Sequence, residues 1–467
     1  MARVSIVIPT YNRLDLLPFT LDSAQSQTYR DLEIIVVDNA SVDGTEAFMT
    51  TRASADPRIL YIRKPVNEGM IASYTTGLMR GTGEFFCTLD SDDTIEPDKV
   101  ARQVTLMDAR PDIDICYTRF WNMDSDGRRI NKTWLLPEGH TLPTLLQGCF
   151  VCFASVMMRR EALLRVGGFD PNIAMVDDWD ILLRFAIDGK PFACIQEPLT
   201  SYRLHRNNIT RNVKNEEVAL MQIFEKTFAN PRLPAEAATM KPQAYTAVHL
   251  WLSYGYHHNG DAENGRRHLA EAIALNPDWQ RDPSRLLLRL REMGLHIRVD
   301  DPVSFMSNVL GHLPENAPLS AMEREQVMNA VRLGAALRAY NRGDIDAGRQ
   351  QIDALARAHP NALNDHETFE SVLIEQAITS LADSPGDFVR LVLSNMPASA
   401  APLTKRSHSL VANVNMLSAF GNYAAGNRRQ VPAQVLAAVR HRPSLLRNRG
   451  VLSIFAKSVL GRQGAAG

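Results

Sequence analysis

The chain has 467 residues, 45% of them hydrophobic, and this length and composition predict two to four domains with ample cores. Its formal net charge of −1 argues against a protein that binds nucleic acid. No apolar run reaches the length of a membrane span, and no signal-peptide pattern precedes Val4. The five cysteines lie in apolar segments of the first 200 residues, as in a reduced cytosolic protein. We therefore expect a cytoplasmic protein.

The first part of the chain alternates apolar strands with amphipathic helices. We predict strands at 4–8, 33–37 and 59–63, each followed by a helix. This alternation is typical of βαβ units with a parallel sheet. Ligands of such sheets bind at the carboxyl ends of the strands, which is where Tyr11 and Asp38 fall.

A fourth apolar strand, 85–89, ends in the acidic cluster Asp90, Asp92 and Asp93. Crowded carboxylates raise one another's pKa unless a positive charge lies between them, and a hard divalent cation such as Mg²⁺ or Mn²⁺ fits oxygen ligands. Such a cation also takes phosphate oxygens from a substrate, so the cluster predicts a metal-assisted diphosphate site. The alternative is an acidic turn that caps the helix near Pro97, and by itself the short D-x-D pattern favours neither interpretation.

A second acidic group opens a predicted helix at 181–186. Asp177, Asp178 and Asp180 flank Trp179 there. Acids at a helix start suit the helix dipole, which is the structural interpretation. The functional interpretation is a general base for an acceptor hydroxyl.

Nucleotide binding would not use a known glycine-rich loop. Neither G-x-G-x-x-G nor G-x-x-x-x-G-K-[ST] occurs, which argues against a dinucleotide fold and a P-loop ATPase. A nucleotide would instead stack on Tyr11 and donate hydrogen bonds to Asp38.

Five segments in order resemble the motifs of family-2 inverting glycosyltransferases with the GT-A fold: VSIVIPTYNRLDLL, EIIVVDNASVDGT, NEG, RGTGEFFCTLDSDD and GGFDPNIAMVDDWDILLRF. The resemblance covers roughly residues 1–212. It implies an α/β, Rossmann-like GT-A catalytic domain with a mostly parallel sheet. It also implies metal-dependent, inverting hexosyl transfer from a nucleotide-diphospho-sugar, UDP-linked by preference. The acceptor would be a glycan, lipid-linked or protein hydroxyl in cell-surface polysaccharide or glycoconjugate synthesis.

The resemblance assigns donor-binding roles to the turns after the strands. It implies that the nucleobase is held by Pro9, Thr10 and Tyr11, and that Asp38 contacts the base. Asn67 belongs to the N-x-G turn and is expected to contact substrate. Many relatives carry Ala-Arg-Asn after that turn, whereas this chain has 72–74 as Ala-Ser-Tyr, so a phosphate-contacting arginine is missing there.

The resemblance also implies the metal site. Asp92 would bind Mn²⁺ or Mg²⁺, Asp90 would serve ribose or a metal-bound water, and Asp93 would cap the following helix. Near the end of the domain, His205 is a second metal ligand or a structural histidine, and Arg203 would screen the diphosphate. Residues 207–211 would form a lid over the donor.

By the same resemblance Asp178 is the catalytic base, with Asp177 as the second choice. No Q-x-x-R-W motif occurs, which favours transfer of a single sugar over processive synthesis. The donor sugar, the acceptor and the linkage stay open.

Beyond residue 212 the pattern becomes helical and repeats at a step of 83 residues. The positions that recur are Gly260, Gly343 and Gly426; Pro277, Pro360 and Pro443; Pro231, Pro314 and Pro397; and Phe305 and Phe388. They predict an all-α solenoid of three repeats over 213–467. The stretch from glycine to proline resembles part of a tetratricopeptide repeat, although Gly265, Gly348 and Val431 replace its usual alanine.

The last predicted repeat is basic. Residues 388–467 contain 11 Lys and Arg and no Asp or Glu, so the rest of the chain carries −12. This end suits an anionic membrane surface, a polyanionic glycan or a protein partner, and the alternative is a solvated basic face. The enzyme would then be peripheral at the inner face of the membrane. A rival function is a catalytically silent scaffold that binds partners through the repeats; a sugar nucleotidyltransferase is disfavoured because its glycine-rich loop is missing.

Overall fold

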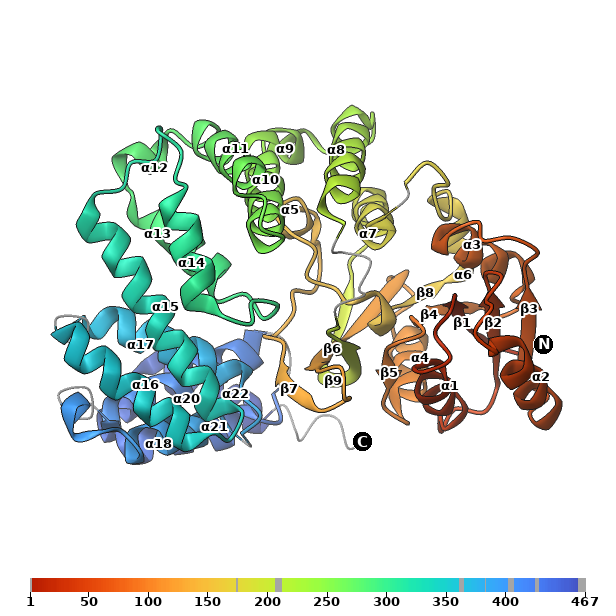
Figure 1. Cartoon of the computed structure of the whole chain (residues 1–467). Helices are drawn as coiled ribbons and strands as arrows, with labels where there is room; N and C mark the ends of the chain where they lie inside the picture. Colours follow the sequence, from red (N-terminus) through yellow and green to blue (C-terminus); the bar gives the residue numbers. More distant parts are fainter. Residues whose placement is uncertain are drawn as a thin grey trace. The chain divides into compact units, whose positions relative to one another are not determined.

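The computed structural model describes residues 2–173, 175–205, 212–360, 365–382, 384–401, 407–424 and 428–460. The chain divides into two compact units. The first unit comprises Met1–Arg129 and Leu136–Val248, and the second comprises Ile130–Leu135 and His249–Gly467. The first contains the sheet, and from His249 onward the described residues form helices without a strand (Figure 1). The functional boundary at residue 212 stays a prediction.

The sheet has nine strands, eight of them in the first unit, and confirms the expected α/β class. Eight of them follow the order β3-β2-β1-β4-β8-β6-β9-β5, and β7 pairs with β6. The strands are β1 (Val4–Thr10), β2 (Leu32–Asp38), β3 (Ile59–Arg63), β4 (Phe85–Thr88), β5 (Thr94–Ile95), β6 (Ile115–Met123), β7 (Arg129–Lys132), β8 (Met157–Arg159) and β9 (Ala193–Arg203). The half from β3 to β4 is parallel. The other half is mixed, because β8 runs antiparallel to β4 and β6 while β9 runs parallel to β6.

Strand β1 is buried along its whole length because helices cover both faces. Val4, Ile6 and Ile8 belong to one core with residues of α1, α2 and α4. The intervening Val7 lies against Gly77 of α3 on the other face. The helices of this unit are α1 (Leu17–Gln25), α2 (Thr45–Ala55), α3 (Met70–Arg80), α4 (Lys99–Ala109), α5 (Leu142–Leu145), α6 (Arg160–Arg165), α7 (Asp177–Asp188), α8 (Val213–Ala229) and α9 (Ala235–Ala238).

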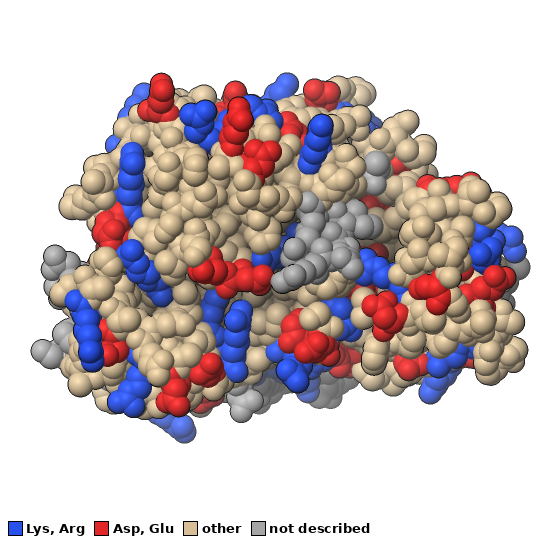
Figure 2. Space-filling model, viewed as in Figure 1, with Lys and Arg blue, Asp and Glu red and all other residues tan. Residues whose placement is uncertain are grey.

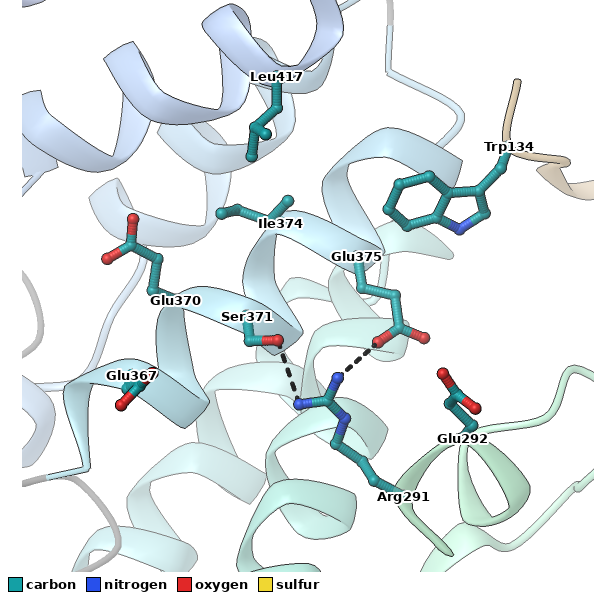
Figure 3. A pocket seen from close by; sticks show the side chains of 9 residues that line it. All are labelled: Trp134, Arg291, Glu292, Glu367, Glu370, Ser371, Ile374, Glu375 and Leu417. Carbon is teal, nitrogen blue, oxygen red and sulfur yellow. Dashed lines mark hydrogen bonds and ion pairs between the residues drawn. The ribbon is translucent and has the colours of Figure 1, made fainter. Parts of the chain in front are cut away.

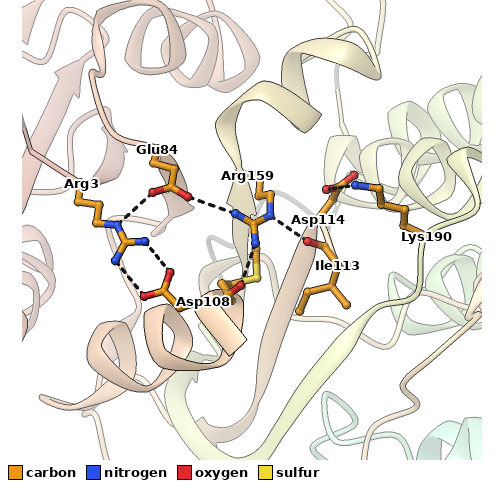
Figure 4. A network of polar contacts seen from close by, with 8 residues as sticks. Arg3, Glu84, Asp108, Ile113, Asp114, Arg159 and Lys190 are labelled. Carbon is orange, nitrogen blue, oxygen red and sulfur yellow. Dashed lines mark hydrogen bonds and ion pairs between the residues drawn. The ribbon is translucent and has the colours of Figure 1, made fainter. Parts of the chain in front are cut away.

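A charged network closes the amino ends of the central strands (Figure 4). Arg3, just before β1, donates from Nε to Glu84 Oε2 at 3.0 Å and from Nη1 to Asp108 Oδ2 of α4 at 2.9 Å. Arg159 of β8 donates from Nη1 to Glu84 Oε1 at 3.2 Å. The two arginines lie over the ring of Phe85, at 5.3 and 5.4 Å from its centroid. This network lies at the amino edge of the sheet, opposite the carboxyl edge at which ligands of such sheets bind.

The second unit is a series of helices that pack on neighbours in sequence. They are α10 (Lys241–His258), whose residues up to Val248 count with the first unit, α11 (Ala262–Ala274), α12 (Asp278–Arg281), α13 (Ser284–Gly294), α14 (Pro302–Gly311), α15 (Ala321–Asn341), α16 (Ile345–Ala358), α17 (His366–Thr379), α18 (Pro385–Ser394), α20 (Ser407–Ala424), α21 (Val431–His441) and α22 (Arg449–Leu460). None of the helices within the described ranges combines the length and apolarity that crossing a membrane requires.

Several structural features of the second unit recur at the 83-residue step. The turns before α11 and α16 contain Gly260 at φ +81° and Gly343 at φ +82°. The next residues, Asp261 and Asp344, are the N-caps and accept from the backbone three residues on. Helices α14 and α18 also start in register, each with proline at its first position. Gly426, the third glycine of this set, lies outside the described residues.

Charges of both signs are interspersed on the molecular face drawn in Figure 2. On that face the described lysines and arginines alternate with aspartates and glutamates. The interaction of the basic segment 388–467 with a membrane or partner stays a prediction.

Candidate active site

The loops after β1 and β2 are held together at the carboxyl edge of the sheet. Thr10, the last residue of β1, lies in register with Asp38, the last of β2. Asn12, at φ 50°, donates its N–H to Ser41 Oγ at 2.9 Å, and its own Oδ1 accepts the N–H of Val42 at 2.8 Å. The two turns therefore form one rigid wall.

The predicted nucleobase residues lie on this wall. Pro9 and Thr10 are buried within β1, whereas Tyr11 is 45% exposed, so its ring has a free surface on which a base could stack. Asn67 is exposed beside the same loops. Its Oδ1 accepts from Asn39 Nδ2 at 2.6 Å and from the N–H of Gly69 at 2.9 Å.

Asp38 is fully buried, and both of its carboxylate oxygens bind protein groups. Oδ1 accepts the N–H of Ser41 at 2.8 Å, and Oδ2 accepts the hydroxyl of Tyr61 at 2.7 Å. Burial, reinforced by Asp38, raises the pKa of Tyr61, so the phenol keeps its proton. Asp38 thus orders the loop after β2, and its direct contact with a base stays a prediction.

Asp90 follows β4 and accepts the hydroxyl of Tyr74 at 2.6 Å. Burial raises the pKa of Asp90 to about 7, with further contributions from the charges of Asp92 and Asp178. Tyr74 belongs to the segment where the expected Ala-Arg-Asn is replaced. It is stacked on Phe169, with ring centroids 5.2 Å apart, so its phenol is held toward Asp90.

The structure brings together the two predicted metal ligands. Asp92 Oδ2 lies 2.8 Å from Nε2 of His205 and 3.3 Å from Nη1 of Arg13. The same Arg13 nitrogen lies 2.9 Å from His205 Nε2. Among the residues that the structure describes, no three histidine, cysteine or acidic side chains gather as metal ligands. Two protein ligands nevertheless suit a cation such as Mg²⁺, which keeps waters and takes substrate phosphates.

Arg13 was missed by the sequence analysis. It belongs to the loop after β1, and its position at the carboxyl end of a strand could have identified it. A guanidinium next to Asp92 can pair with a phosphate group in two-pronged geometry.

The prediction that Asp93 caps the following helix is wrong. Helix α4 begins at Lys99 with Asp98 as its N-cap residue. Asp93 is fully buried instead, and its Oδ1 accepts the N–H of Arg203 at 2.9 Å. Burial, followed by the charge of Asp92, raises the pKa of Asp93 well above its usual value. Its carboxyl thus ties the acidic turn to the end of β9.

Arg203 holds the backbone of the acidic turn through hydrogen bonds to carbonyl groups. It is 5% exposed and donates from Nε to the carbonyl of Asp92 at 2.8 Å and from Nη1 to the carbonyl of Ser125 at 3.0 Å. These contacts fix the backbone of Asp92. Screening of a diphosphate by Arg203 stays a prediction, and Arg13 is the guanidinium that contacts the Asp92 carboxylate.

Helix α7 presents the second acidic group. It starts at Asp177 after Val176, which has a left-handed backbone at φ 56°. Trp179 Nε1 donates to the carbonyl of Leu145 at 2.7 Å and anchors this first turn. Asp178 acts electrostatically on Asp90, which links the start of α7 to the acidic turn.

Asp177 is 3% exposed, and its Oδ2 finds no hydrogen-bond partner within the described ranges. Burial raises its pKa well above the usual value, and the charges of Asp178 and Asp90 add to this shift. The predicted lid at 207–211 lies outside the described residues.

Comparison with known proteins gives a consistent family. Residues 5–167 match the family described as "Glycosyl transferase family 2". The "Putative teichuronic acid biosynthesis glycosyltransferase TuaG" of Bacillus subtilis is 30% identical over 209 residues, which is 45% of this chain and 82% of that protein. "Chondroitin synthase" of Escherichia coli is 29% identical over 211 residues, 44% of this chain and 29% of that one.

Solved structures resemble the chain more weakly. "S. aureus TarS 1-349 in complex with UDP-GlcNAc" has a TM-score of 0.46 at 14% identity, with 72% of this chain and 92% of that chain covered. The "Mannosyltransferase PcManGT from Pyrobaculum calidifontis in complex with GDP-Man and Mn2+" has a TM-score of 0.43 at 20% identity, with 66% and 84% covered.

Proposed function

Because the chain belongs to glycosyl transferase family 2 and is a glycosyltransferase, we propose that its α/β unit, which has a GT-A-like fold, carries out sugar transfer at the site described above. It transfers a single hexose with inversion from a nucleotide-diphospho-sugar, UDP-linked by preference, to a glycan, lipid-linked or protein hydroxyl. A divalent cation, Mn²⁺ or Mg²⁺, assists this transfer. Two relatives are named for teichuronic acid biosynthesis and chondroitin synthesis, which supports a role in cell-surface polysaccharide synthesis.

One observation carries this proposal: the approach of Asp92 to His205, with Arg13 beside both. A cation held by Asp92 and His205 would supply electrostatic stabilisation of the leaving diphosphate. Arg13 would pair with a phosphate oxygen, and Tyr11 would stack on the base. Arg203 holds the backbone of Asp92 in position for this binding.

Asp178 is the proposed general base. An inverting transfer needs one base that takes the proton of the acceptor hydroxyl. Asp177 is 3% exposed whereas Asp178 is partly exposed, so Asp178 is the carboxylate that an acceptor hydroxyl can reach more easily. Asp178 also lies near enough to Asp90 to raise its pKa, which supports a shared site.

The test is release of UDP from a panel of UDP-sugars by the full chain, with Mn²⁺ or with EDTA. We expect Asp92→Asn and His205→Gln to lose Mn²⁺-dependent UDP binding. We expect Asp178→Asn to keep that binding and to lose roughly 10²–10⁴-fold in kcat. The exposed Asp112→Asn, whose carboxylate pairs with Arg110, is the matched control and should behave as wild type.

Turnover in EDTA equal to that in Mn²⁺ would contradict the metal assignment. No turnover with any donor, together with full tolerance of Asp92→Asn, would favour the silent scaffold. If Asp177→Asn lost sugar transfer while Asp178→Asn retained it, Asp177 would be the general base.

We further propose that residues 1–212 form the catalytic domain and 213–467 three repeats related to tetratricopeptide units. The equivalent turns at Gly260 and Gly343 support this, as do the equivalent starts of α14 and α18. The basic end at 388–467 would dock the enzyme on an anionic inner leaflet. Liposome flotation tests this docking, and equal, negligible binding to anionic and neutral vesicles would refute it.

A further inference from the structure

The second unit contains a pocket that the proposed reaction does not use (Figure 3). Its volume is about 550 Å³, within the range of roughly 300–1,000 Å³ that is typical of ligand sites. Every lining residue belongs to the second unit: Trp134, Arg291, Glu292, Glu367, Glu370, Ser371, Ile374, Glu375 and Leu417. The pocket therefore lies within one unit, between its helices and the segment Ile130–Leu135.

One wall of the pocket is aromatic. Trp134 is 46% exposed, although a side chain of this size is usually covered in a packed helical region. Figure 3 shows its indole on the same side of the pocket as Glu375 and Glu292. An exposed indole beside carboxylates offers a flat apolar face and hydrogen-bond acceptors to one ligand.

The polar wall has unused hydrogen-bonding capacity. Glu375 of α17 has a partly exposed side chain, and its contact with Arg291 Nη2 is a 3.8 Å ion pair, too long for a hydrogen bond. Burial raises the pKa of Glu375, while Arg291 opposes the shift. Arg291 is itself oriented by Ser371, which accepts from Nη1 at 3.1 Å. The buried Nε of Arg291 has no partner in the described part of the chain.

The charge of the lining selects among ligands. Four glutamates and one arginine give a formal net charge of −3. Anionic glycans and nucleotide diphosphates would be repelled, because like charges across a partly desolvated site are unfavourable. Neutral hydroxyl groups, by contrast, can donate to the carboxylates and accept from Arg291.

We propose that this pocket binds a neutral, hydroxyl-rich oligosaccharide, with one sugar ring on the face of Trp134 and hydroxyls donating to Glu375 and its acidic neighbours. The pyranose face is apolar through its C–H groups, whereas its rim is polar, which matches the two walls. The identification of this oligosaccharide with the acceptor chain rests on the proposed glycosyltransferase function. The binding itself does not.

The test is isothermal titration of the full chain with two neutral probes, cellohexaose and the hexamer of β-1,4-linked N-acetylglucosamine. A galacturonic acid hexamer and a lysine hexapeptide are the charged comparisons. We expect at least one neutral hexamer to bind and the uronic acid hexamer not to bind. Trp134→Ala should weaken binding about tenfold, the scale of a lost aromatic contact. Glu375→Gln, which preserves shape, should also weaken it.

The control variant is Met322→Ala, because Met322 is 71% exposed on α15 of the same unit and does not line the pocket. Its affinity for the hexamer should equal that of wild type. Failure of both neutral hexamers to bind would overturn the proposal, and so would unchanged binding in Trp134→Ala and Glu375→Gln. Tighter binding of the uronic acid hexamer or of the lysine peptide would overturn it in favour of that ligand.

The same samples separate this proposal from the proposed function. Mn²⁺-dependent UDP binding is measured in parallel and should be unchanged in Trp134→Ala and Glu375→Gln. Hexamer binding without any donor turnover would refute the reaction and keep the pocket. Donor turnover without hexamer binding would refute the pocket proposal and keep the reaction.

Discussion

Asp92 and His205 lie 113 residues apart in the chain, and their side chains are 2.8 Å apart in the structure. Two hydrogen bonds between a side chain and the backbone bring these residues together. The carboxyl of Asp93 accepts the N–H of Arg203, and the guanidinium of Arg203 binds the carbonyl of Asp92. The acidic turn after β4 is therefore fastened to the end of β9, and His205 follows two residues later. At the scale of single residues, the geometry of the site depends on this fastening.

Arg13 should have opposite effects on the metal and on the donor. Its Nη1 lies 3.3 Å from Asp92 Oδ2 and 2.9 Å from His205 Nε2, where it would compete with a cation for the same two groups. We expect Arg13→Gln to lower the Mn²⁺ concentration needed for half-maximal activity. We also expect the KM for the donor to rise about tenfold, because a charged hydrogen bond to phosphate is lost.

Steady-state kinetics at varied Mn²⁺ and varied UDP-sugar checks both effects. Arg128→Gln is the control, since Arg128 is exposed and its Nη1 lies 4.0 Å from the exposed Asp126. If the Mn²⁺ requirement and the donor KM of Arg13→Gln moved in the same direction, the assigned position of Arg13 would be wrong.

At the scale of elements, the approach of α3 to β1 positions Thr10 and Tyr11, which are proposed to hold the nucleobase. A Cβ at Gly77 would lie 2.3 Å from Cγ1 of Val7, which is far inside van der Waals contact. Strand β1 ends three residues after Val7 at Thr10. A displacement of β1 would therefore shift Thr10 and Tyr11 together.

Gly77→Ala should consequently reduce both stability and donor affinity. Overpacking of this kind costs about 1–3 kcal/mol in the free energy of unfolding. Thermal unfolding and UDP titration measure the two effects. Gly148→Ala is the matched control, because no atom lies within 4 Å of the Cβ position and its backbone is ordinary. A Gly77→Ala variant as stable as Gly148→Ala would contradict this packing.

The two glycines that depart from the tetratricopeptide pattern have a steric cause. A Cβ at Gly265 would lie 2.5 Å from Cδ2 of His257, and one at Gly348 would lie 2.6 Å from Cδ2 of Tyr340. These two pairs are themselves 83 residues apart. A large ring on the first helix thus requires glycine on the second, where a smaller partner would leave room for alanine.

At the scale of the whole molecule, the surroundings of His257 and His296 predict that the helical unit is sensitive to acid. Burial lowers the pKa of His257 to about 4, and nearby His312 adds to this effect while Asp261 opposes it. Burial also lowers the pKa of His296 to about 3, with contributions from Arg298, Arg338 and His258. Neither ring nitrogen of His257 has a hydrogen-bond partner in the ranges described above.

These shifts predict that stability falls as pH falls. The unfolded chain takes up the protons near the ordinary value of 6.5, whereas the folded chain takes them up only near pH 3–4. Stability is therefore complete above about pH 6.5 and declines from there toward pH 4, by roughly 3 kcal/mol at most for each histidine.

Urea unfolding at pH 7.5 and pH 4.5 measures this loss. His257→Gln should unfold with a smaller difference between the two pH values, whereas the exposed His140→Asn should show the same difference as wild type. Equal pH dependence in His257→Gln and wild type would show that His257 does not carry the effect.

The sequence by itself determined the α/β class of the first unit, the helical character of the second and the family. It also led to the prediction that Asp92 binds the metal and that Asp178 is the catalytic base of the same site. Hydrophobic periodicity and turn chemistry are local properties, so they can be recognised in any short window of the chain. The rule that ligands bind at the carboxyl ends of parallel strands then connects Tyr11, Asp38 and Asp90 without coordinates.

Only the tertiary structure decided the roles of side chains whose partners lie far away in the chain. Arg13 meets His205, Arg203 turns to backbone carbonyls, and Asp93 binds the end of β9 in place of a helix start. Trp134 likewise acquires its pocket from helices more than 150 residues further along. Hydrogen bonds and packing between distant segments depend on the relative placement of whole elements, and no local pattern encodes that placement.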